Sequence, residues 1–299
     1  MPPSPFLPTC IRWSRPLGLG LALLFGSASA LALDVEPGTY TAQPAGNNAL
    51  GLFYVHAERD ARYANGNKLP GHTSLIGDSV QAKYLHYLKA GDLTVAPGFI
   101  LACGRSRAGG SLAALGEAHG CADPIVGAIF WLDNRPEEKR YFGITPYLSV
   151  PVGQYDKTRA LNLGENRWKG GINSGISLPL GERAMLDLVG DLQWFGANDE
   201  YLGTRRLEQA PLANIQLHLR YPLGPNLRLA ASYLHDWGGA TSINGIAQHD
   251  EKNQGRFRLG IGRSLGPQRF IQVDLGGDTK VENGYRESGR LVVRYVLRF

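Results

Sequence analysis

Residues 213–221 of the chain, ANIQLHLRY, alternate between apolar and polar side chains without a break. The apolar positions are Ala213, Ile215, Leu217, Leu219 and Tyr221. The polar positions are Asn214, Gln216, His218 and Arg220. Successive side chains of a β-strand point to opposite faces of the sheet, so this stretch predicts a strand with one apolar and one polar face.

The same alternation recurs along most of the chain. It is clear in residues 255–261, 270–276 and 291–299. Less regular segments bring the expected number of strands to twelve: 50–59, 79–89, 93–103, 124–132, 141–153, 168–178, 184–195 and 227–237. Each is long enough to cross a bilayer as a tilted strand of roughly 9 to 11 residues.

Short turns separate these strands at a nearly constant interval. LGER begins at Leu180, LGPN at Leu223 and LGPQ at Leu265, and looser turns surround Gly91 and Pro136. Between successive short turns we expect two strands and one long polar loop, such as residues 196–210 or 238–252. Short turns at one end and long loops at the other are typical of outer-membrane barrels, with the short turns in the periplasm.

Energetics decide which face meets lipid. A closed sheet pairs every backbone group, and an arginine on its lipid face would cost about 2 to 4 kcal/mol at mid-membrane. The apolar face is therefore expected outside. Two interfacial girdles are expected, the first at the short turns with Trp131, Tyr141 and Tyr221, the second at the long loops with Trp168, Trp194 and Trp237.

Two other all-β folds share part of this pattern. A β-propeller also repeats every 40 to 45 residues, but it needs four short strands in each repeat. A soluble sandwich has no use for uniformly placed short turns. We therefore expect an all-β, transmembrane, antiparallel up-and-down barrel of about twelve strands in the outer membrane of a Gram-negative bacterium. Its aromatic C-terminal residue, Phe299, is similar to the signal that the barrel assembly machinery recognises.

The N-terminus predicts export. Arg12 and Arg15 precede the apolar run of residues 17–32, and small residues at Ala28 and Ala30, or at Ala30 and Ala32, suit signal-peptide cleavage. We expect a signal peptide over residues 1–32 and the barrel over residues 49–299. Residues 33–48 form either a periplasmic tether or a plug inside the pore, and the plug is slightly favoured.

Composition excludes some partners and leaves others open. The formal net charge is +5, and about +3 remains after the signal peptide, which carries no acid. Such a small charge gives no case for a nucleic-acid partner, and outer-membrane lipid is the partner expected. Cys103 and Cys121 are expected to form a disulfide worth ~3 kcal/mol in an oxidising compartment, with two unpaired thiols as the alternative.

The polar face supplies candidate pore-lining residues. The candidates are Lys83, Lys169, Asp187, Asp191, His218, Arg220, Arg228, Asp236, Arg256, Arg258, Asp274, Arg294 and Arg298. More of them are basic than acidic, so the pore is expected to favour anions or polar aromatic solutes whose rings lie over guanidinium planes. The alternative for each residue is that it pairs across strands and simply fills the barrel.

The sequence contains no catalytic or metal-binding motif that would favour an enzyme over a channel. There is no G-x-S-x-G or H-E-x-x-H, and the histidines lack metal-ligand spacing. We expect no enzyme, no cofactor and no metal, with a lipid-modifying barrel enzyme as the least favoured alternative.

Several motifs together resemble one family. They are residues 33–66, CADP at 121–124, SVPVGQYD at 149–156, LGENRW at 163–168 and the terminal RYVLRF. In this order they look like the meta-pathway phenol-degradation family of outer-membrane proteins. The resemblance implies a β-barrel associated with uptake of aromatic or hydrophobic compounds. We therefore expect passive uptake of a small solute of that kind, or of its anion, with a non-conducting structural or surface-interaction barrel as the alternative.

Overall fold

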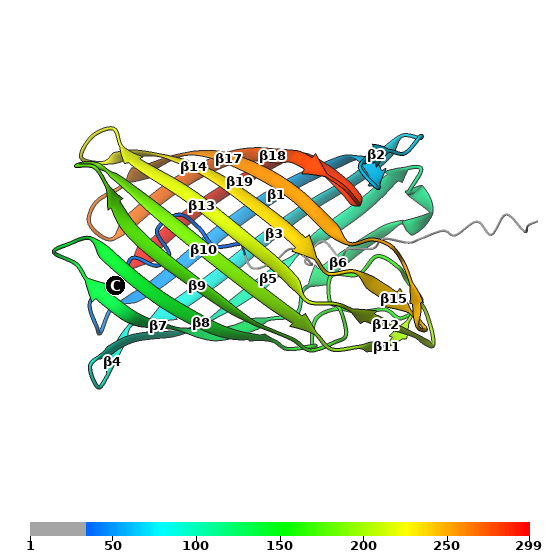
Figure 1. Ribbon diagram of the computed structural model, residues 1–299, viewed down its shortest axis with the longest axis horizontal. Helices are drawn as coiled ribbons and strands as arrows, with labels where there is room; N and C mark the ends of the chain where they lie inside the picture. The colour runs from blue at the N-terminus through cyan, green and yellow to red at the C-terminus, as the bar shows by residue number, and fades with distance from the viewer. Residues whose placement is uncertain (1–33) are drawn as a thin grey trace, which may run out of the picture.

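The computed structural model describes residues 34–299, so the expected signal peptide lies outside the described part of the chain. Twelve long antiparallel strands follow one another around a barrel (Figure 1). They are β1 (Asn48–Ala64), β3 (Thr73–His86), β5 (Leu93–Gly110), β7 (Ile125–Arg135), β8 (Arg140–Ser149), β9 (Lys169–Leu180), β10 (Ala184–Phe195), β13 (Leu212–Pro222), β14 (Leu227–Gly238), β17 (Lys252–Ser264), β18 (Arg269–Val281) and β19 (Gly284–Arg298).

The first and last strands close the barrel. β1 pairs with β19 from Ala49 opposite Arg298 to Tyr63 opposite Gly284. Closure gives every long strand two neighbours, which satisfies the backbone groups that hydrocarbon could not. The predicted twelve-stranded transmembrane barrel is confirmed, and with it the outer-membrane location.

The two ends of the barrel differ in the length of their connections. At the short-turn end the strands are joined by residues 87–92, 136–139, 181–183, 223–226 and 265–268. Gly181 and Gly266 adopt φ of 63° and 111°, which glycine reaches without the strain of a Cβ. At the long-loop end the connections are longer, except that residues 282 and 283 alone join β18 to β19. That two-residue turn departs from the expected pattern.

Small elements gather at the long-loop end. β2 (Asn67–Lys68) extends β1, and β6 (Glu117–Cys121) pairs with β5 after the 3-10 turn η1 (Ala113–Leu115). A separate sheet contains β11 (Asn198–Tyr201), β12 (Arg205–Gln209), β15 (Thr241–Ile243) and β16 (Ile246–Ala247) (Figure 1). At the other end β4 (Leu88–Ala90) pairs with β5.

Within residues 34–299, no helix is long and apolar enough to cross a membrane.

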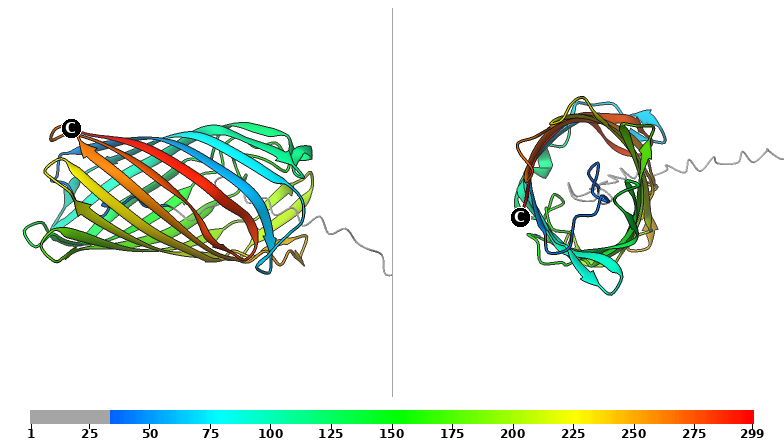
Figure 2. Two further views of the ribbon diagram at one scale, coloured as in Figure 1. Left: turned by 90° about the horizontal axis from the view of Figure 1, so that it is seen from above. Right: turned by 90° about the vertical axis from the view of Figure 1, so that its left-hand side faces the viewer.

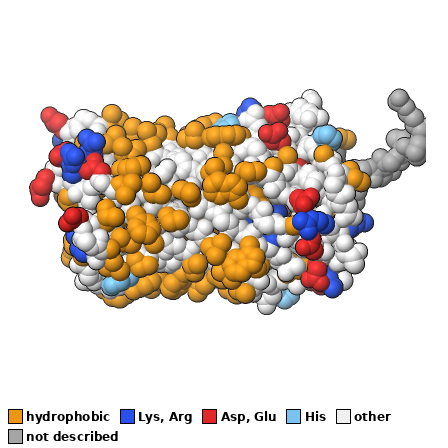
Figure 3. Space-filling view, turned by 60° about the horizontal axis from the view of Figure 1, so that its bottom comes forward, with side chains coloured by type: hydrophobic (Ala, Val, Ile, Leu, Met, Phe, Trp, Pro, Cys, Tyr) orange, Lys and Arg blue, Asp and Glu red, His pale blue; other side chains and the backbone are white. Residues whose placement is uncertain are grey.

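The outer wall carries a broad apolar band, and charged side chains gather at the two ends (Figure 3). β13 shows how the alternation produces this band. Ile215 is 51% exposed and Leu217 40% exposed, whereas Gln216 and His218 between and beside them are 0% and 1% exposed. The predicted orientation, with apolar side chains outside and polar ones inside, is therefore correct for this strand.

Two expected girdle residues lie inside the barrel instead. Trp131 is 1% exposed and Tyr141 is buried with it, whereas Tyr221, Trp168, Trp194 and Trp237 lie on the surface. The reason is that residues 124–132 are apolar on both faces, so no alternation indicates which face turns inward. The pairing of β7 with β8 also shifts its register between Trp131 and Asp133. The expectation was wrong for Trp131 because the inner face of β7 contacts other apolar groups, and it was wrong for Tyr141 of β8 because this side chain belongs to the same buried cluster.

Candidate solute site in the barrel lumen

The segment before β1 lies inside the barrel. In the end-on view the blue trace at the start of the described chain runs within the ring of strands (Figure 2). The backbone N–H of Val35 donates to Gln216 Oε1 at 3.0 Å, and that of Gly38 donates to Asp187 Oδ2 at 2.9 Å. Trp131 Nε1 donates to the carbonyl oxygen of Tyr40 at 2.7 Å. These contacts hold residues 34–41 against three parts of the wall.

Three ion pairs add to this attachment. Asp34 pairs with Arg258 of β17 and, at 3.7 Å, with Arg256 of the same strand, and Glu36 pairs with Lys83 of β3. Burial would raise the pKa of each carboxyl group, but the nearby cations outweigh it and hold both pKa values below their ordinary range. Both carboxylates are therefore charged near neutral pH, and the segment is held by electrostatic attraction as well as by hydrogen bonds.

This segment separates two cavities. The first has a volume of 310 Å³ and lies toward the short-turn end, between the segment and the ends of β13, β14, β18 and β19. The second, of 230 Å³, lies toward the long loops and is lined by Lys169, His218 and Arg258. Asp34, Glu36 and Pro37 line both cavities. We call the first the short-turn cavity and the second the central cavity.

One wall of the short-turn cavity is apolar and aromatic. Tyr40, Tyr87, Ala96 and Ile129 line this wall and belong to one buried cluster that also contains Trp131. The rings of Tyr87 and Trp131 are stacked, with centroids 5.5 Å apart. The inner face of β7 therefore joins the aromatic residues of its neighbours, which is why its apolar run does not alternate.

The facing wall is basic. The guanidinium of Arg228 lies 3.8 Å from the centre of the Phe270 ring, and that of Arg294 lies 5.5 Å from it. Gln272 Oε1 accepts hydrogen bonds from Arg228 Nη2 at 3.3 Å and from Arg294 Nη2 at 2.8 Å. Arg298 also lines this wall. The two walls together make a cavity that is apolar on one side and cationic on the other.

The basic residues of the lumen fall into two groups. In the first, each cation has a carboxylate partner: Arg220 with Asp187 at 2.8 Å, Arg256 with Asp236 at 2.6 Å, Lys169 with Glu165 at 2.6 Å, and the Arg258 and Lys83 pairs described above. In the second group are Arg228, Arg294 and Arg298, which form no ion pair within residues 34–299. Their charge is therefore the part of the basic wall that is open to a ligand.

All candidate pore-lining residues face the interior. The short-turn cavity brings together Lys83, Arg220, Arg228, Arg294 and Arg298, and the central cavity brings together Lys169, His218, Arg258 and Asp274. Asp191 accepts from Tyr147 Oη at 3.0 Å, and Asp236 accepts from Arg256. Nδ1 of His218 lies 2.8 Å from Ser232 Oγ.

Sequence reasoning missed the charged residues that enter the lumen from outside the strands. Among these are Asp34 and Glu36, and also Glu165, which binds Arg167 and Lys169 at 2.6 Å each. These two cations outweigh the effect of burial and lower the pKa of Glu165 to about 2. The sequence did carry a signal for Glu165. Odd-numbered residues of β9 face inward, and residues 165 and 167 continue that alternation into the loop before Lys169.

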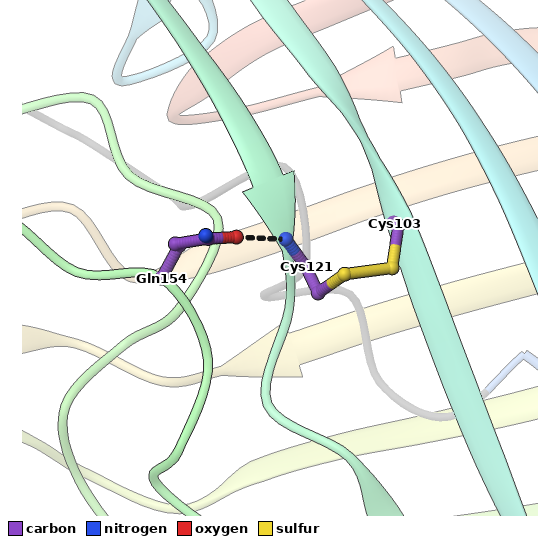
Figure 4. Close-up of a disulfide and its surroundings, with 3 residues drawn as sticks. All are labelled: Cys103, Cys121 and Gln154. Atoms are coloured by element: carbon purple, nitrogen blue, oxygen red, sulfur yellow. Dashed lines mark hydrogen bonds between the residues drawn. A yellow bond between two sulfur atoms is a disulfide. The ribbon is translucent and has the colours of Figure 1, made fainter.

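The two cysteines lie opposite each other on β5 and β6. Cys103 and Cys121 form a disulfide, and the backbone N–H of Cys121 donates to Gln154 Oε1 at 2.6 Å (Figure 4). The bond ties the loop of residues 111–120 to the wall, and Gln154 ties the next loop to it. Within the described chain no group of His, Cys, Asp and Glu is arranged to hold a metal ion.

Comparison with known proteins identifies the family. Residues 59–295 match the family described as MetA-pathway of phenol degradation. An outer membrane channel from Pseudomonas putida F1 is similar in structure with a TM-score of 0.85 and 37% identity, covering 89% of this chain and 100% of that one. No curated protein sequence matches the chain.

Two more distant barrels share the fold alone. One is the β domain of the Bordetella autotransporter BrkA, with a TM-score of 0.53 and 11% identity, covering 86% of this chain and 100% of that one. The other is a deltaS2 mutant of the monoaromatic hydrocarbon channel TodX, with a TM-score of 0.50 and 12% identity, covering 88% and 93%. The family match and the 37% identical channel together establish that the chain belongs to the MetA-pathway phenol-degradation family of outer-membrane barrels.

Proposed function

We propose that this protein is a passive outer-membrane channel that admits small aromatic compounds, or their anions, to the periplasm. The observation that carries the proposal is the short-turn cavity. Its volume of 310 Å³ is at the small end for ligand sites, and it offers an aromatic wall opposite three unpaired arginines. Such a cavity suits a planar apolar solute with one polar or charged end.

The relatives support this proposal. The protein from Pseudomonas putida F1 that is 37% identical is an outer membrane channel, and the family description refers to phenol degradation. Transport through such a channel needs no catalytic group, and we propose that the protein carries out no chemical step. The candidate pore-lining residues serve in this proposal as the polar surface along which solute moves.

The segment of residues 34–41 would have to move for solute to pass. It lies between the two cavities and is held by hydrogen bonds, by ion pairs and by the packing of Val35 and Tyr40 in the buried apolar cluster. We propose that the structure is the closed state and that displacement of this segment opens the channel. Insertion of the barrel depends in this proposal on the assembly machinery, for which the exposed C-terminal Phe299 is the recognition residue.

Single-channel recording tests the function. The mature protein, reconstituted in planar bilayers, should produce discrete conductance steps, and liposomes containing it should release an enclosed aromatic solute faster than empty liposomes. A variant that lacks residues 34–46 should conduct more often and at a higher level. A correctly folded barrel that stays silent in both forms would instead support the non-conducting structural or surface-interaction barrel.

A further inference from the structure

Arg228 and Arg294 of the short-turn cavity have no carboxylate partner among the described residues. Side chains that only fill the barrel would be expected to pair their charges. Arg294 is 5% exposed, and its Nε has no hydrogen-bond partner; the Nε of Arg228 also has none. Buried guanidinium groups normally have carboxylate or carbonyl partners, because unpaired charge is costly away from water. Gln272 provides a single neutral oxygen for both. Both residues line the short-turn cavity, so within the described chain their guanidinium groups offer an anion in it positive charge that no carboxylate pairs with.

Phe270 fixes the geometry of the two arginines. It is buried, and both guanidinium groups lie near its ring, at 3.8 and 5.5 Å from the centre. Cation–π contacts and the shared bond to Gln272 hold both charges close together, although like charges repel. The donors are thus preorganised, so a ligand would lose little of its binding energy in ordering them.

From this geometry we infer that Arg228 and Arg294, stacked on Phe270, form a binding site for the carboxylate of a small aromatic acid, whose ring lies toward Tyr40 and Tyr87. The inference rests on the proposed function and names its substrate class. A carboxylate has two oxygens and can accept from both guanidinium groups, which a hydroxyl group cannot match in charge or in number of acceptors. The aromatic wall favours a ring over an aliphatic chain.

The site also adjoins the segment that closes the lumen. Arg294 Nη2 donates to the carbonyl oxygen of Pro37 at 3.5 Å, and Glu36 lines the same cavity while it binds Lys83. A carboxylate bound to Arg294 replaces that weak contact with a charge-assisted one. Its negative charge would also lie near that of Glu36, so ligand binding weakens the attachment of the segment.

Equilibrium binding to the purified protein in detergent tests the site without requiring conduction. Benzoate is the probe, benzyl alcohol is its uncharged counterpart, and acetate lacks the ring. We expect benzoate to bind more tightly than either, and to bind roughly tenfold more weakly for each of Arg228→Gln and Arg294→Gln, as expected for loss of one charge-assisted hydrogen bond. Arg206→Gln is the matched control and should leave binding unchanged, because Arg206 of β12 forms an exposed ion pair with Asp199 outside the lumen cavities.

The outcomes separate the site from the channel function. Heat-modifiable gel mobility of each variant verifies folding before binding is measured. Equal affinity for benzoate and benzyl alcohol, or unchanged benzoate binding in the folded double variant, overturns the site even if the wild type conducts. Arginine-dependent benzoate binding by a barrel that never conducts would support the site and refute the channel.

Discussion

The long-loop and short-turn parts of the lumen use the same residue type for different purposes. Arg256 toward the long loops is 1% exposed and bonds to Asp236, which is 0% exposed and also accepts from Asn214 at 2.6 Å. Among residues 34–299, Arg228 and Arg294 near the short turns form no ion pair, and both lie over an aromatic ring. An arginine that points into the lumen is therefore not always available to solute. It is available only where no carboxylate on another part of the barrel pairs with it.

Removing a paired arginine should have the largest effect. Arg256→Met leaves the Asp236 carboxylate buried without its cation, and loss of one partner of a buried pair destabilises a protein by about 3–5 kcal/mol. Urea unfolding of the reconstituted barrel, followed by tryptophan fluorescence, measures the change. The double variant Arg256→Met with Asp236→Leu should recover much of the loss. Equal stability of the single variant and the wild type would contradict the structural role of this pair.

Weakening the attachment of the N-terminal segment should come next. Asp34→Asn with Glu36→Gln removes all three ion pairs of the segment, and the two that are also hydrogen-bonded are each worth about 1.5–3 kcal/mol. The closed state should lose population, and the open probability in single-channel recordings should rise by more than tenfold. The barrel itself should unfold at the same urea concentration, because the segment is not one of its strands. Unchanged gating would show that backbone hydrogen bonds and the packing of Val35 and Tyr40 hold the segment without the ion pairs.

Removing the unpaired arginines should alter selectivity more than stability. Arg228→Gln with Arg294→Gln relieves repulsion between two like charges, so the free energy of unfolding should change by about 1 kcal/mol or less. The reversal potential in a salt gradient should shift away from anion preference. Arg256→Gln with Arg258→Gln should shift it less, since carboxylates already offset those charges. A larger shift in reversal potential from Arg256→Gln with Arg258→Gln would show that the paired arginines, and not the unpaired ones, set the selectivity.

Mild acid should have the smallest effect. Carboxyl groups whose pKa is lowered in the folded protein contribute stability above their ordinary pKa, and lose it only as pH falls through the lowered value. The pKa values of Asp34 and Glu36 are lowered, so both stay charged at pH 5. Open probability should therefore be the same at pH 7 and pH 5. If the channel opened between pH 7 and pH 5, a titrating group other than Asp34 and Glu36 would control the closed state.

The barrel was predictable because its signal is local. Alternation in residues 213–221 gives the strand, its two faces and their orientation, since lipid accepts only one of those faces. The inward direction of Trp131 was not predictable, because residues 124–132 are apolar on both faces. Pairing of cations was not predictable either. Arg256 and Asp236 lie on neighbouring strands, but Arg258 meets Asp34, which is 224 residues away along the chain.

The seam between β1 and β19 has a consequence for biogenesis. Ala49 lies opposite Arg298, so the first strand to leave the ribosome is paired by the last. Until then both β1 and β18 present unpaired backbone donors and acceptors, which act as templates for pairing with other chains. A periplasmic chaperone that shields both edges, or a catalyst that holds the C-terminal strand while the earlier ones add, shortens that exposure. Truncation within β19 should therefore cause aggregation and proteolysis of the nascent protein instead of a leaky pore.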